Sequence, residues 1–88
     1  MSDKYKVVMH FMDENHSEYC TDEADELMAY NDALSYVIDL INREIAESLC
    51  VWMHENYHME VDRVSDFEFV LTYRDGSYTI YNIEESKD

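Results

Sequence analysis

Large apolar residues that recur at helical spacing limit the possible folds of this chain more than any other feature. They follow one another at steps of seven, four, three, four, four and three residues: Leu27, Leu34, Ile38, Ile41, Ile45, Leu49 and Trp52. At 100° per residue, these side chains lie within an arc of roughly 80°. The spacing predicts one long amphipathic helix over about residues 22–56, with an apolar stripe that another layer must cover.

The predicted helix begins in an acidic segment. Thr21 can cap it, and the carboxylates of its first turn would lie at the positive end of the helix dipole. Alternatively, the segment breaks near Asn31 and a second helix begins there, capped by Asn31 and Asp32. The face opposite the stripe carries Asp25, Asp32 and Asp39, with Tyr36, Arg43 and Glu47. The three aspartates are seven residues apart, so they would stand about 10 Å from one another along the axis.

Two other parts of the chain show the pattern of β-strands. Residues 4–12 alternate Tyr5, Val7, Met9 and Phe11 with mostly polar residues, which predicts a half-buried strand. Residues 66–73 and 77–84 flank Asp75 and Gly76, a pair typical of the two-residue type I′ turn of a β-hairpin. With Arg74 opposite Ser77, the face of this hairpin that receives the helix would carry Phe67, Phe69, Leu71, Tyr73, Tyr78 and Ile80.

The order strand, helix, strand, strand predicts a single α+β domain over residues 1–88. A helical crossover makes the first two strands point the same way, so the first strand can pair antiparallel with the third. We therefore expect a β-α-β-β fold in which one long amphipathic helix packs on a three-stranded antiparallel sheet of order 1-3-2. Proline is absent and the single glycine lies in the hairpin, so nothing indicates a linker or a second domain.

Residues 13–26 are acidic at half of their positions and contain no lysine or arginine. The whole chain has 21 acidic and 6 basic residues, a formal net charge of −15 with the histidines neutral. This charge argues against direct binding to nucleic acid or an anionic membrane, and it favours fast association with a cationic protein surface. We predict a partner-binding surface made of Asp13, Glu14, Glu18, Asp22, Glu23, Asp25, Glu26, Asp32, Tyr36, Asp39 and Glu47. A charged outer face that is only hydrated is the alternative.

In size, charge, tyrosine content and absence of proline, the chain resembles small phage-encoded inhibitors of the DNA-mimic kind, the anti-CRISPR and anti-restriction proteins. We predict an inhibitor that is not an enzyme and needs no cofactor. The resemblance implies a bacterial or phage setting, and therefore action in the bacterial host cytoplasm. It implies as partner the basic nucleic-acid-binding surface of a Cas effector, a restriction enzyme or another nuclease. Duplex DNA carries about one negative charge per 1.7 Å of axis, so such a mimic needs dense carboxylates on a rigid frame. The oligomeric state can be a monomer or a homodimer. An acidic adaptor that binds a protein with no nucleic-acid role is an alternative function.

Residues 54–58 match the HExxH pattern and resemble the zinc site of metalloproteases. There, two histidines one helical turn apart bind Zn²⁺ and the glutamate activates a water molecule. The matching residues are His54, Glu55 and His58. The resemblance covers only these five positions, because Val61 and Val64 stand where metzincins have glycine and histidine. No good third ligand follows, so we predict no catalytic residue and no metal site, with a small zinc-binding protein or hydrolase as the alternative.

Cys20 and Cys50 are too few, and too far apart, to indicate a disulfide framework. The sequence opens with no charged and then apolar leader, and no apolar run approaches the roughly 20 residues of a membrane-spanning helix. These features predict a cytosolic protein with reduced thiols.

Overall fold

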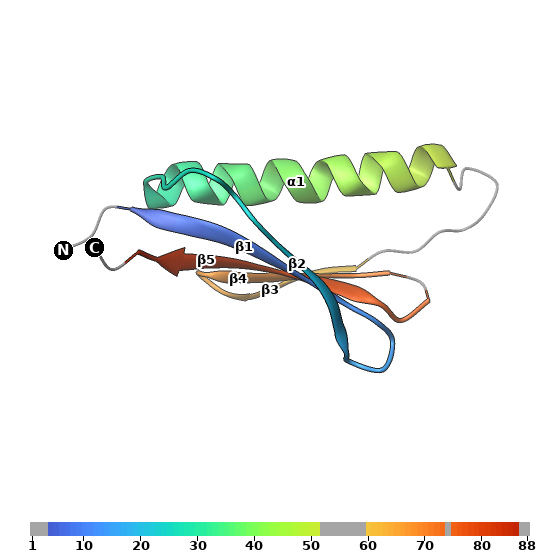
Figure 1. The fold of residues 1–88 in the computed structure, drawn as a ribbon. Coiled ribbons are helices and arrows are strands. Elements are labelled where there is room, and N and C mark those ends of the chain that lie inside the picture. Colours follow the sequence, from blue (N-terminus) through green and yellow to red (C-terminus); the bar gives the residue numbers. More distant parts are fainter. Residues whose placement is uncertain (1–3, 52–59, 74, 87–88) are drawn as a thin grey trace.

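The computed structural model describes residues 4–51, 60–73 and 75–86. In this part of the chain the elements follow one another as β1 (Tyr5–Met12), β2 (Glu18–Glu23), α1 (Tyr30–Val51), β3 (Glu60–Ser65), β4 (Glu68–Thr72) and β5 (Tyr78–Glu85). The strands form one antiparallel sheet of order β2-β1-β5-β4-β3, and α1 lies along one face of it (Figure 1). The described residues therefore form two layers, a helix and a five-stranded sheet.

The predicted three-stranded sheet of order 1-3-2 is wrong, because β2 and β3 extend the sheet at its two edges. The central pairs β1–β5 and β5–β4 are antiparallel, which matches the pairing expected for the three predicted strands. Every residue of β2 and β3 is exposed. A strand without a buried face lacks a clear alternation of apolar and polar residues, so the sequence does not reveal it.

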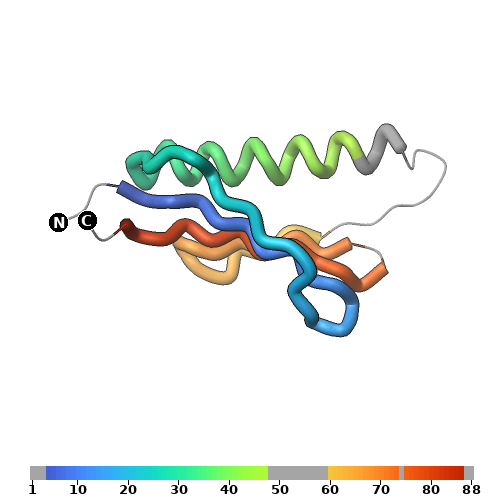
Figure 2. The backbone as a smooth tube through the Cα atoms, viewed as in Figure 1, coloured from blue at the N-terminus to red at the C-terminus, as the bar shows by residue number. Residues whose placement is uncertain are grey.

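Helix α1 begins at Tyr30, so the predicted start near residue 22 is wrong. Asp22 and Glu23 belong to β2, and residues 24–29 lead from the edge of the sheet to the first turn of α1 (Figure 2). Pairing with β1 satisfies the backbone of the acidic segment, whereas a helix there would bury little apolar surface. The alternative start near Asn31 is one residue from the observed one. The predicted end near residue 56, and the side chains of Leu49 and Trp52, lie outside the described part of the chain.

The β4–β5 hairpin is offset by one residue from the predicted register. Leu71 pairs with Thr79, and the N–H of Tyr73 donates to the Ser77 carbonyl at 2.8 Å. The N–H of Gly76 donates to the Tyr73 carbonyl at 3.1 Å, and Gly76 has a φ of 95°. Three residues thus separate Tyr73 from Ser77, a loop length in which a left-handed glycine often precedes the second strand. The predicted two-residue type I′ turn is wrong.

This offset reverses the two faces of β5, because side chains alternate along a strand. Thr79, Tyr81 and Ile83 are buried on the side of the helix. Tyr78 and Ile80 lie half-buried on the other face of the sheet. Their predicted place against the helix is therefore wrong.

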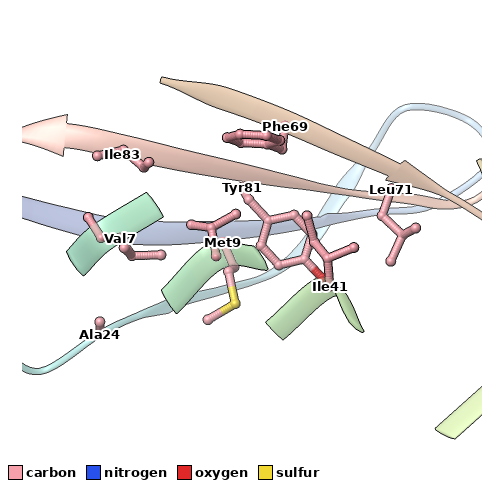
Figure 3. Close-up of a cluster of buried hydrophobic side chains, with 10 residues drawn as sticks. Val7, Met9, Ala24, Ile41, Phe69, Leu71, Tyr81 and Ile83 are labelled. Atoms are coloured by element: carbon pink, nitrogen blue, oxygen red, sulfur yellow. The ribbon is translucent and has the colours of Figure 1, made fainter. Parts of the chain in front are cut away.

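The core lies between α1 and the sheet (Figure 3). Its buried members are Val7, Met9, Ala24, Ala33, Val37, Ile41, Phe69, Leu71, Tyr81 and Ile83. Helix α1 buries Ala33, Val37 and Ile41, whereas Ile38 and Leu27 of the predicted stripe are 44% and 38% exposed. The buried face of the helix is thus rotated by roughly 70° from the predicted stripe. The small Ala33 side chain allows α1 to approach the sheet closely, which a search for large apolar residues does not detect.

Candidate functional site

An open groove of about 570 Å³ lies between the β2–α1 connection and the N-terminal half of α1. Its lining residues are Ala24, Asp25, Glu26, Met28, Asp32, Ser35, Tyr36 and Asp39. Four of these eight residues are carboxylates, and none is a lysine, arginine or histidine. The groove therefore combines a strong negative charge with apolar surface and an aromatic ring.

One wall of the groove is the β2–α1 connection, which is fastened to β1 at both ends. At one end, the buried Ala24 donates its N–H to the Val7 carbonyl at 2.9 Å. At the other end, Tyr5 and Met28 exchange two backbone hydrogen bonds of 2.7 and 2.9 Å. The two carboxylates between these anchors are exposed. The backbone on each side of them is fixed, so this wall has a defined shape.

The other wall is one side of α1. Asp32, Tyr36 and Asp39 follow at steps of four and three residues, which places them on the same side of a helix. Asp32 and Asp39 stand about 10 Å apart along the axis. Tyr36, between them, is 37% exposed. Ala33 and Val37 of the same turns are fully buried against the sheet, so this side of the helix is held in place.

The charge of the groove favours a cationic ligand. Four carboxylates around one open space repel one another, and a positive group placed among them would relieve this repulsion. A guanidinium group can stack on the face of the Tyr36 ring while its N–H donors face carboxylate oxygens. The arrangement therefore suits a lysine or, better, an arginine side chain of another protein.

The predicted partner-binding residues divide between the groove and other surfaces. The groove contains Asp25, Glu26, Asp32, Tyr36 and Asp39. Six other predicted residues do not line it: Asp13, Glu14, Glu18, Asp22, Glu23 and Glu47. The division arises because part of the acidic segment is a strand, in which alternate side chains point to opposite faces.

Glu18 and Glu23 lie on the face of the sheet that is turned away from α1. Glu23 Oε2 is 2.9 Å from Lys6 Nζ, and the hydrogen bond and charge of Glu23 raise the pKa of Lys6. Glu18 Oε1 lies 2.5 Å from both the Thr21 hydroxyl and His10 Nδ1. Hydrogen bonds from Thr21 and then from His10 lower the pKa of Glu18. Both carboxylates thus already have contacts within the sheet.

Asp13 and Asp22 have local roles in the backbone. Asp13 Oδ1 accepts hydrogen bonds from two backbone N–H groups of the turn between β1 and β2, each at 2.9 Å. Asp22 Oδ1 accepts the N–H of Glu23 at 3.0 Å. Glu14, in the β1–β2 turn, and Glu47, on α1, are exposed away from the groove.

Three residues of the groove were not predicted: Ala24, Met28 and Ser35. A continuous helix from residue 22 would leave no separate wall for Ala24 and Met28 to form. Their signal in the sequence is that Ala24, Leu27 and Met28 interrupt an acidic run, which indicates contact with the core.

The HExxH residues His54, Glu55 and His58 lie outside the described residues. Within residues 4–51, 60–73 and 75–86, no group of three or more histidine, cysteine, aspartate or glutamate side chains is arranged to hold a metal ion. Cys20 is a free, exposed thiol on β2. The side chain of Cys50 is outside the described part.

No helix in the described ranges is both long and apolar enough to cross a membrane.

Comparisons with protein-family models, curated proteins and solved structures found no match for this chain.

Proposed function

We propose that this chain is an acidic protein inhibitor that binds the basic nucleic-acid-binding surface of a target protein. The target class comprises Cas effectors, restriction enzymes and other nucleases. The observation that carries the proposal is the groove, whose lining contains four carboxylates and the Tyr36 ring but no cationic residue. A lysine or arginine bound there is withheld from the phosphates that it would otherwise contact. Inhibition then follows from competition for the same basic residues.

The fixed backbone that carries the carboxylates supports this proposal. Buried Ala33 and Val37 anchor the helical wall, and backbone hydrogen bonds of Ala24 and Met28 anchor the other wall. A backbone that is already ordered loses little conformational entropy on binding, so its carboxylates compete better with the phosphates of nucleic acid. Tyr36 adds an aromatic ring, a residue type that is enriched in the centres of protein interfaces.

The net charge of −15 supports the same class of partner. Long-range attraction speeds the encounter with a cationic surface, and salt weakens this attraction. We place the encounter in the cytoplasm, where such nucleases meet their nucleic-acid substrates.

A capture and competition experiment tests the proposal. The immobilised chain captures proteins from a bacterial lysate at low salt, and a captured protein is identified and purified. Fluorescence anisotropy then follows its binding to labelled duplex DNA or RNA while the chain is added. We expect the chain to displace the nucleic acid, and its inhibitory affinity to fall about tenfold or more between about 50 and 200 mM salt.

Two double variants with equal charge locate the binding surface. Asp32→Asn with Asp39→Asn removes two charges from the groove, and Glu14→Gln with Glu47→Gln removes two from outside it. We expect the groove variant to lose about tenfold in affinity and the control variant less than about threefold, because contacts between exposed charges each contribute up to about 1 kcal/mol. An equal loss in both variants would contradict the groove as the site. Simultaneous binding of the chain and nucleic acid to the captured protein would contradict inhibition and identify an adaptor.

A further inference from the structure

The sheet has a second face that none of the described elements covers (Figure 1). Strands β4 and β5 alternate between buried residues, on the side of α1, and half-buried residues, on the other side. The half-buried residues of these strands are Glu68, Val70, Thr72, Tyr78, Ile80 and Asn82. This face is therefore an unpartnered surface within the described part of the protein.

The centre of this second face is largely apolar. Neighbouring strands place two rows of residues across it: Met12, Tyr78 and Thr72 in one row, and His10, Ile80 and Val70 in the next. All six side chains are only partly buried, so each keeps surface that a partner can cover. The two rows are about 7 Å apart along the strands. This spacing corresponds to about 1.3 turns of a helix, at about 5.4 Å per turn.

Carboxylates lie on both sides of this apolar centre. They are Glu18 and Glu23 on β2, Glu60 and Asp62 on β3, Glu68 on β4 and Glu84 on β5. Strand β1 places two basic residues on this face, Lys6 and His10, and they contact Glu23 and Glu18. The six carboxylates outnumber these two basic residues of β1, so the described part of the face carries a net negative charge.

We infer that this face is a docking surface for a basic amphipathic helix of a partner protein. The apolar side chains of that helix cover the two central rows, and its flanking lysines and arginines meet the carboxylates of β2 and β3. Four strand spacings separate β2 from β3, about 19 Å, whereas a helix with its side chains is about 10–12 Å across. The helix therefore fits between the two acidic edges, and long basic side chains span the remaining distance.

The other face of the same sheet already accommodates a helix, because α1 packs there on β1 and β5. Charge selects the occupant of the second face. A second copy of this chain, or an acidic helix, would bring carboxylates against carboxylates. Since the groove lies on the side of α1, this inference does not depend on the inhibitor function proposed for the groove.

An NMR titration of the full chain tests the inference. The probe is a synthetic helical peptide of about 18 residues, five turns, with a ridge of leucines flanked by lysines. A control peptide keeps every lysine and has glutamine in place of leucine. We expect amide shifts concentrated in β1, β4 and β5, and binding of the control peptide at least about tenfold weaker because it buries no apolar surface.

A pair of matched variants tests where the peptide binds. Ile80→Thr removes apolar surface from the centre of the face and keeps a residue that favours strands. Ile38→Thr makes the same change on the exposed side of α1. Circular dichroism first confirms that both variants fold. We expect Ile80→Thr to weaken peptide binding about fivefold or more and Ile38→Thr less than about twofold.

Three outcomes would overturn the inference. They are equal binding of the two peptides, shifts confined to residues 24–39 around the groove, and no shift at about 1 mM peptide. A fourth contradicting outcome is self-association of the chain, measured by sedimentation, that Ile80→Thr abolishes. That outcome would assign this face to a second copy of the chain.

Discussion

Two neighbouring residues of α1 test how the helix lies on the sheet. Val37 is fully buried, whereas Ile38 is 44% exposed, although Ile38 is larger and belongs to the regular apolar stripe. We predict that Val37→Ala lowers the free energy of unfolding more than Ile38→Ala does. The smaller deletion should thus have the larger effect.

The expected magnitudes follow from burial. Val37→Ala removes two methyl groups from a closed site, which costs about 1.6 kcal/mol in transfer free energy. A residual cavity of about 40 Å³ adds about 1 kcal/mol, and the higher helix propensity of alanine offsets about 0.6 kcal/mol. The net loss is about 2 kcal/mol. Ile38→Ala deletes three carbons from a site that is roughly half open to solvent and leaves no closed cavity, so its net loss is about 1 kcal/mol or less.

Urea unfolding followed by circular dichroism measures both losses. In a domain of this size, a loss of 2 kcal/mol lowers Tm by about 8–16 °C, which thermal unfolding detects independently. The dependence of the free energy on urea should stay the same in both variants, because neither changes the surface exposed on unfolding by much. A larger loss for Ile38→Ala would refute the reasoning, because it would mean that the regular stripe faces the sheet.

Three further predictions concern the turns and the buried tyrosines. Gly76→Ala should lower the free energy of unfolding in urea by about 1–2 kcal/mol, since Gly76 has a φ of 95°. Gly76→Asn should lose less, because asparagine tolerates this conformation better. Equal stability of all three proteins would contradict the left-handed conformation of Gly76. Burial raises the pKa of Tyr73 to about 12 and also raises the pKa of Tyr81. The folded chain thus keeps both phenols neutral at pH values where those of the unfolded chain ionise, near pH 10. The urea concentration at the midpoint of unfolding should therefore stay constant up to about pH 10 and decrease towards pH 12. Tyr81→Phe should reduce this fall, and an unchanged fall would contradict its cause. Asp13→Ala should lower the free energy of unfolding by about 1 kcal/mol. It should also speed hydrogen exchange of the two turn amides that donate hydrogen bonds to Asp13. Asp13→Asn should retain most of the stability.

The central strands are predictable because each has one buried face. In β1, the alternation of Tyr5, Val7, Met9 and Phe11 reflects contacts with the core, and these contacts also fix its orientation. The edge strands β2 and β3 have no buried residue, so their positions depend on backbone pairing that leaves little trace in the sequence. The fold prediction therefore failed at the edges of the sheet.

The register of the hairpin and the rotation of the helix required information that residue types do not carry. Asp75 and Gly76 suit both a two-residue and a three-residue loop, and one residue of difference exchanges the two faces of β5. Ala33 and Val37 form the helix contact because they are small enough to bring α1 near the sheet. A pattern of large apolar residues points instead to Ile38.

The groove was predictable in part. Helical spacing alone places Asp32, Tyr36 and Asp39 together, and this side of α1 does line the groove. Asp25 and Glu26 reach the same groove from the β2–α1 connection, which exists only because β2 is a strand. The sequence therefore indicates one wall, and the fold adds the other.

The irregular, charged edges of the sheet have a consequence for solubility. An edge strand offers its backbone to any other exposed strand, which is a common route to aggregation. Here both edge pairings contain a bulge or similar irregularity. In addition, Asp22 Oδ1 accepts a hydrogen bond from the N–H of Glu23 on β2. Carboxylates on β2 and β3 repel a second edge of the same kind at neutral pH. The protein should stay dispersed when concentrated near pH 7, and it should lose this protection below about pH 4, where carboxylates become protonated.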